Sequence, residues 1–63
     1  MKSENLIKAG DSFNFFLGDL RAAHTDAVNA NNQFAEIAIM SLIEQAAKLS
    51  LQVARLKDAA ILQ

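Results

Sequence analysis

His24 is the side chain best suited to proton transfer or metal binding, because it is the only histidine and imidazole exchanges a proton near neutral pH. It falls on the apolar stripe of the first helical segment, flanked by Ala23 and Ala27. One interpretation is a pH-sensitive or ligand-binding group inside a helical bundle. The other, which we favour, is a boundary histidine with one ring edge in water. Asp26 lies two positions away and points elsewhere on a helix, so the local sequence builds no histidine–carboxylate pair.

The remaining polar residues form no pattern typical of catalysis. Asp19 and Asp26 are seven residues apart and share a helix face, but no Glu-x-x-His sequence accompanies them, as a di-metal bundle would need. Ser12, Ser41 and Ser50 have no adjacent base to activate them, and there is no glycine-rich phosphate loop. We therefore predict a protein that is not an enzyme, with no catalytic residues, no metal and no cofactor.

Basic residues of the second half offer one possible nucleic-acid contact. Lys48, Arg55 and Lys57 fall near one helix face, with Gln45 and Gln52 beside them. Phosphate contacts dominate nucleic-acid affinity and usually require a net basic patch, whereas this chain has a formal net charge of −1 and a pI of about 5.6. We favour a solvated outer face and do not expect nucleic acid as the partner.

The pattern of apolar residues predicts an all-α fold in a single domain over residues 1–63. Proline is absent, only two glycines occur, and strand-type alternation is missing. Asparagine caps helix starts and tolerates the left-handed conformation that ends helices, so the run at 29–32 predicts a turn. We expect a first helix over about 3–29, capped by Ser3, the turn over about 29–32, and a second helix over about 32–62. The first helix is expected to continue through Gly10, although a firm start at Asp11 is nearly as good.

Two heptad-spaced stripes predict how the helices pack as an antiparallel hairpin. The step from Ala27 to Ala35 is eight residues, so the stripes are out of phase and the chain must bend between them. We place Leu42 and Leu49 at the centre of the contact. The expected contact residues of the first helix are Leu6, Phe13, Leu20 and Ala27 with Ala9, Phe16 and Ala23, and those of the second are Ala35, Leu42, Leu49 and Leu56 with Ile39, Ala46, Val53 and Ala60.

The apolar surface exceeds what one hairpin can bury, which predicts a homodimer. Hydrophobic residues make up 52% of the chain, and a 63-residue domain has a thin core without disulfides to support it. The apolar arc of the second helix spans roughly 140°, wider than the ~100° that one partner helix covers. We therefore expect two hairpins to form a four-helix bundle.

Three residues are the candidate partner-binding residues: Phe15, Lys48 and Arg55. Phe15 lies off the Phe13/Phe16 stripe, so it is either a dimer contact, which we favour, or an anchor for another protein.

The longest apolar-rich stretch, residues 34–43, is too short for a membrane span of ~20 residues. No secretion signal is evident at the start of the sequence, so a cytoplasmic protein without membrane contact is expected.

Two resemblances extend these expectations. In length and architecture the chain resembles the Rop-type plasmid copy-number regulators, which implies, as an alternative, a dimeric RNA-binding regulator using Lys48 and Arg55. The segment Lys2–Phe13, KSENLIKAGDSF, together with the small size and helical character, resembles the accessory proteins of the early exo–xis region of lambdoid bacteriophages. That resemblance implies a phage-encoded early protein that binds an unidentified host or phage protein and affects phage development or host physiology.

Overall fold

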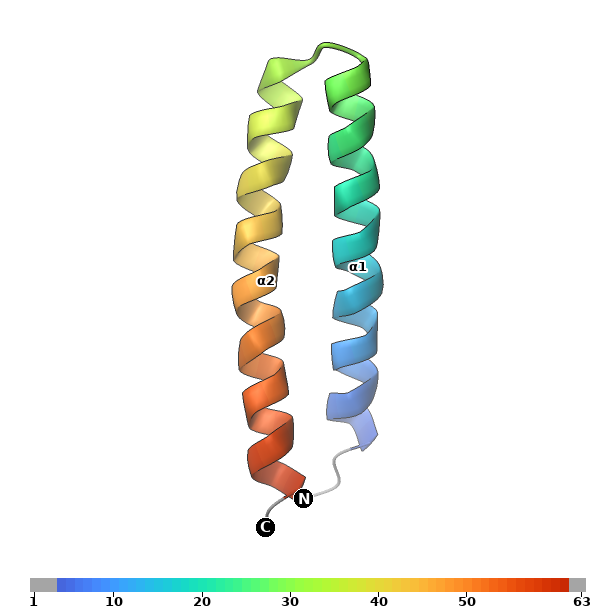
Figure 1. Ribbon diagram of the computed structural model, residues 1–63. Helices are drawn as coiled ribbons and strands as arrows, with labels where there is room; N and C mark the ends of the chain where they lie inside the picture. Colours follow the sequence, from blue (N-terminus) through green and yellow to red (C-terminus); the bar gives the residue numbers. More distant parts are fainter. Residues whose placement is uncertain (1–3, 62–63) are drawn as a thin grey trace.

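Two long helices joined by a short turn make up the part of the chain that the structure describes. The computed structural model describes residues 4–61, with side chains described for residues 4–59. Helix α1 spans Glu4–Asn29 and helix α2 spans Gln33–Ile61, and the two lie side by side in opposite directions (Figure 1). The predicted all-α hairpin is therefore confirmed. Ser3, the expected cap of the first helix, and Leu62 lie outside the described residues.

Asparagine 31 ends α1 by adopting the left-handed conformation. Its φ is 54°, the one positive φ of a non-glycine residue in the described chain. The N–H of Asn31 donates to the carbonyl of Val28 at 3.1 Å, and the N–H of Asn32 donates to the carbonyl of Ala27 at 3.0 Å. These two hydrogen bonds are those of a Schellman motif, which satisfies carbonyls that the helix end leaves without a partner.

Asparagine 32 starts α2 directly after this motif. Its side-chain Oδ1 accepts a hydrogen bond from the N–H of Ala35 at 3.1 Å, and its carbonyl accepts one from the N–H of Glu36 at 2.9 Å. This is the geometry of an N-cap, in which a side-chain oxygen satisfies a free amide of the first turn. One asparagine thus ends the first helix and the next begins the second, which explains why the chain reverses within three residues.

Helix α1 runs without interruption through Gly10, as favoured over a start at Asp11. Gly10 is half-buried between the helices, and a Cβ added there would lie 3.9 Å from Cγ1 of Val53, an ordinary contact distance. Gly18 faces open space, with no atom within 4 Å of an added Cβ. Neither glycine has a positive φ, so the helix tolerates both of them without needing either.

The line of contact between the helices, which we call the seam, follows alternating steps of three and four residues. Leu17, Ala27 and Ala46 are the buried apolar residues among those described, and Ala46 is only 4% exposed. Around them lie half-buried residues. On α1 these include Leu6, Gly10, Phe13, Leu20 and His24, and on α2 Ile39, Ile43, Ser50, Val53 and Lys57.

The prediction that Leu42 and Leu49 lie at the centre of the seam is wrong. Each is 48% exposed, and Leu56 is exposed to a similar degree. The second seam column of α2 is instead Ile43, Ser50 and Lys57, one residue further along. The leucine column and the Ile43 column lie on either side of a third column, Ile39, Ala46 and Val53, which was assigned correctly. Helix α1 contacts the Ile43 column, which contains the smaller and polar side chains.

A matching shift occurs on α1. The column of Leu6, Phe13, Leu20 and Ala27 was assigned correctly, whereas Ala9 and Phe16 are exposed. Their expected places in the seam are taken by Gly10 and Leu17, whereas Ala23 is half-buried, as expected, next to His24.

By length and composition, one segment of the described chain could cross a membrane. It is Gln33–Ala59 of α2, whose most apolar 18-residue window has a mean hydropathy of 1.2 and is scarcely buried. We expected no spanning segment because the longest apolar-rich stretch is short. The hydropathy averaged along α2, a different measure, does not support that expectation. Glu44 and Lys48 lie within this segment.

Replacing Asn32 by alanine should lower the free energy of unfolding by about 1 kcal/mol, because the N-cap hydrogen bond to Ala35 is lost. Asn14→Ala is the matched control, since Asn14 is exposed in the middle of α1, where alanine is the better helix former. Urea denaturation at one fixed protein concentration measures both. Equal losses in the two variants would contradict the capping role of Asn32.

Replacing either glycine by alanine should stabilise the hairpin by about 0.5–1 kcal/mol, since both lie inside α1. Gly18→Ala measures the gain in helix propensity alone. Gly10→Ala should gain at least as much, because its new methyl group meets Val53 at an ordinary contact distance. Thermal unfolding checks both variants, and destabilisation by Gly10→Ala would show that the helices pack more closely than described.

Candidate interaction surfaces

The seam divides the hairpin into two broad faces that differ in chemistry. Met40 and Ala54 follow seam residues Ile39 and Val53 by one position, a rotation of about 100° to one side. Leu42, Leu49 and Leu56 follow Ile39, Ala46 and Val53 by three positions, which places them about 60° to the other side. Met40 shares a groove with His24 of α1, and Ala54 shares one with Ile7 and Asn14. The leucines therefore lie on the face opposite both grooves.

We call this opposite surface the leucine face. On α1, Ile7 and Asn14 follow the seam residues Leu6 and Phe13 by one position and line a groove, so Phe16, three positions after Phe13, lies on the leucine side. The ring of Phe16 packs edge-on against Phe13, with centroids 6.4 Å apart and planes at 64°. The face consists of Leu42, Leu49 and Leu56 of α2 with Ala9, Phe16 and Ala23 of α1.

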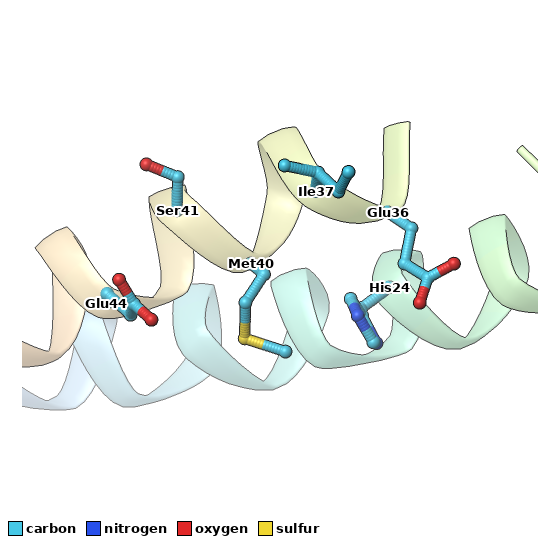
Figure 2. A pocket seen from close by; sticks show the side chains of 6 residues that line it. All are labelled: His24, Glu36, Ile37, Met40, Ser41 and Glu44. Atoms are coloured by element: carbon cyan, nitrogen blue, oxygen red, sulfur yellow. The ribbon is translucent and has the colours of Figure 1, made fainter. Parts of the chain in front are cut away.

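The other surface, which we call the groove face, carries most of the polar groups near the seam. At the turn end a groove of about 340 Å³ is lined by His24 from α1 and by residues of α2. Figure 2 shows His24 on one side of it and Glu36 and Met40 on the other. Ile37, Ser41 and Glu44 complete the lining.

His24 is half-buried, as the boundary interpretation expected, but its acidic neighbours come from the other helix. Glu36 and Glu44 line the same groove, whereas Asp26 does not. Neither helix alone reveals this grouping in the sequence, because it depends on which residues of the two helices lie level. Gly10 and Val53 lie level in this antiparallel hairpin, so any two residues whose numbers sum to about 63 also lie level. His24 is therefore level with a point on α2 between Glu36 and Glu44. Among the described residues, no group of three His, Cys, Asp or Glu side chains could hold a metal ion.

A second groove, of about 150 Å³, lies on the same face towards the chain ends. Lys57 lines it and is half-buried there, together with Gly10, Ser50 and Val53. Lys48 and Arg55 are exposed on the outer side of α2, each two residues from the nearest seam positions. The structure therefore separates Lys57 from the basic strip in which the sequence placed it, leaving two basic residues two helical turns apart.

Phe15 lies on the outer side of α1. It is 77% exposed, two positions after the seam residue Phe13, and it lines a shallow hollow with Asp11 and Asn14. A rotation of about 200° from Phe13 points it away from α2, and a rotation of about 100° separates it from Phe16 of the leucine face. Phe15, Lys48 and Arg55 are thus all exposed, but Phe15 is on one outer side of the hairpin and the two cations are on the other.

A further exposed aromatic residue, which the sequence analysis did not predict as a contact, lies close to the turn. Phe34, at the start of α2, is 85% exposed, and Ile37 and Met40 beside it are also exposed. Its position in the sequence, two residues after the Asn32 cap and before the first seam residue of α2, is the signal from which its exposure could be predicted.

No family model, no curated protein and no solved structure matches this chain.

Proposed function

We propose that this chain is a small non-enzymatic regulatory or accessory protein that works as a homodimer and acts by binding another protein. The leucine face carries this proposal. A row of exposed large apolar side chains along one face of a hairpin is typical of association surfaces. Full burial of a leucine contributes about 1.5–3 kcal/mol, and roughly half of that is still available for each leucine of this face in the single hairpin.

The small size of the seam supports the same proposal. With three buried residues in the described chain, the hairpin alone has a core far below that of an independently stable domain. Pairing with a second hairpin supplies the missing burial and leaves the outer sides of both helices free for a further protein.

Phe15, Lys48 and Arg55 are the proposed contacts to that further protein. An exposed aromatic ring and exposed cations are residue types enriched where proteins recognise one another. The resemblance of Lys2–Phe13 to phage accessory proteins supports a host or phage protein as the target, the host cytoplasm as the location, and an effect on phage development or host physiology.

The protein should sediment at micromolar concentration with twice its monomer mass of 6.8 kDa. Because folding is then coupled to association, the melting temperature should rise with protein concentration. Sedimentation equilibrium and circular dichroism measure these two properties. A 6.8 kDa species whose melt does not depend on concentration would contradict the homodimer.

Changing Phe15 to asparagine, or Lys48 and Arg55 together to glutamate, should abolish capture of the target by the tagged protein from bacterial lysate. Helicity and dimer mass should not change, because all three residues are exposed outside the leucine face. Phe34→Asn controls for the loss of an exposed ring, and Lys8→Glu with Arg21→Glu controls for the charge reversal.

Two results would contradict these residue assignments. One is capture that survives both changes. The other is equal loss of capture in the control variants, which would mean that general hydrophobicity or charge controls the interaction.

A further inference from the structure

We propose that a second copy of this chain covers the leucine face, related to the first by a two-fold axis at the level of Phe16. The two hairpins then lie antiparallel, with their turns at opposite ends of a four-helix bundle. This inference rests on the homodimer of the proposed function and adds which face is buried and in which direction the partner runs.

The leucine face has the area that a stable dimer requires. The hairpin measures 49 × 15 × 10 Å between Cα atoms, so one broad face covers roughly 700 Å², close to the ~800 Å² that each partner buries in a standard protein interface. The groove face has the same outline, but polar residues such as His24, Glu36 and Lys57 line its grooves. The leucine face is therefore the better match to a second apolar surface.

The spacing of the leucines fits an antiparallel partner. Because Gly10 and Val53 lie level, Leu56, Leu49 and Leu42 lie level with positions 7, 14 and 21 of α1, whose numbers complete the same sum of 63. A two-fold axis at position 16 places the same three leucines of the second copy level with positions 25, 18 and 11 of α1 in the first copy. The leucines of the two copies then alternate by three and four residues, which is the spacing of knobs-into-holes packing.

The α1 side of the leucine face is symmetric about Phe16. Ala9 and Ala23 each lie seven residues from it, so the same axis brings Phe16 to the Phe16 of the second copy. Each Ala9 then lies level with the other copy's Ala23. Two large rings meet at the centre and small residues meet on both sides, so the α1 helices can approach along their length.

Charge selects the antiparallel direction over one with both turns at the same end. The half nearer the turn, residues 17–47, has four carboxylates and one cation, which are Asp19, Asp26, Glu36, Glu44 and Arg21. The described residues of the other half have three carboxylates and four cations, which are Glu4, Asp11, Asp58, Lys8, Lys48, Arg55 and Lys57. Antiparallel hairpins place each acidic half beside a basic half, whereas the other direction places two acidic halves together.

Spin labels near the turn test the direction of pairing. The chain has no cysteine, so Asn29→Cys gives a single nitroxide site, exposed at the end of α1 and on the side away from the seam. The two-fold axis at position 16 places position 29 of the second copy level with position 3 of the first copy. At ~1.5 Å per residue, the two labels should therefore lie ~40 Å apart. Hairpins with both turns at one end would hold the two labels at the same level, on α1 helices that lie diagonally across the bundle, at less than ~30 Å, since neighbouring helices in a bundle are 8–10 Å apart.

A label at Gly18→Cys is the matched control, because position 18 lies close to the axis and gives a short distance in either direction of pairing. A distance of ~40 Å at position 29 supports the inference. A short distance at both positions overturns the antiparallel direction and leaves the homodimer standing. A monomer mass for both labelled proteins, with helicity retained, overturns the inference and the homodimer together.

Charge insertion tests which face is buried. Leu49→Glu should convert the dimer to a monomer, whereas Leu51→Glu should not, because Leu51 has similar exposure but lies off the leucine face. A dimer that survives Leu49→Glu overturns the assignment of the face. If the wild-type chain is monomeric and floats with phosphatidylcholine vesicles, a lipid surface occupies the face and the inference is overturned. The spin-label distance decides the matter where Leu49→Glu fails to fold.

Discussion

Close contact between two helices along a single narrow seam determines the rest of this structure. One helix can cover only one stripe of its neighbour, and here the stripes are rich in small side chains. Ala27 and Ala46 are buried, and Gly10 brings the backbone of α1 near Val53. Small residues let the helices approach, but they bury little apolar area. The larger apolar residues of α2 are consequently left at the edge of the seam, where a single hairpin covers only half of their surface.

The turn fixes which stripes can meet. Asn31 in the left-handed conformation and Asn32 as the N-cap leave no slack between the last turn of α1 and the first turn of α2. Once the entry of α2 is fixed, its rotation about its own axis is limited, and so is the column that faces α1. Ile43 and Ser50 then enter the seam, although Leu42 and Leu49 are the more apolar pair. Local hydrogen bonding thus takes precedence over the burial of the largest side chains.

The sequence predicts the helices and the turn well because those depend on local preferences. An asparagine-rich break between two heptad stripes has few other interpretations, and the continuity of α1 through Gly10 follows from the unbroken phase. It does not predict the seam of α2, because two adjacent apolar columns share one wide arc and only the rotation of the helix selects between them. The grouping of His24 with Glu36 depends on the pairing level of two helices, which no single stretch of sequence contains.

The difference between the two broad faces would also limit how far the proposed association can proceed. If both faces were apolar, hairpins could stack on either side and continue into an open assembly. Here the groove face carries His24 and Glu36 at the turn end and Lys57 and Ser50 towards the chain ends. Covering them would remove charged groups from water, which costs free energy that burial of the leucine face does not. An association that uses one self-complementary face closes after two copies. The polar seam residues, which weaken the hairpin on its own, would thus keep its assembly finite.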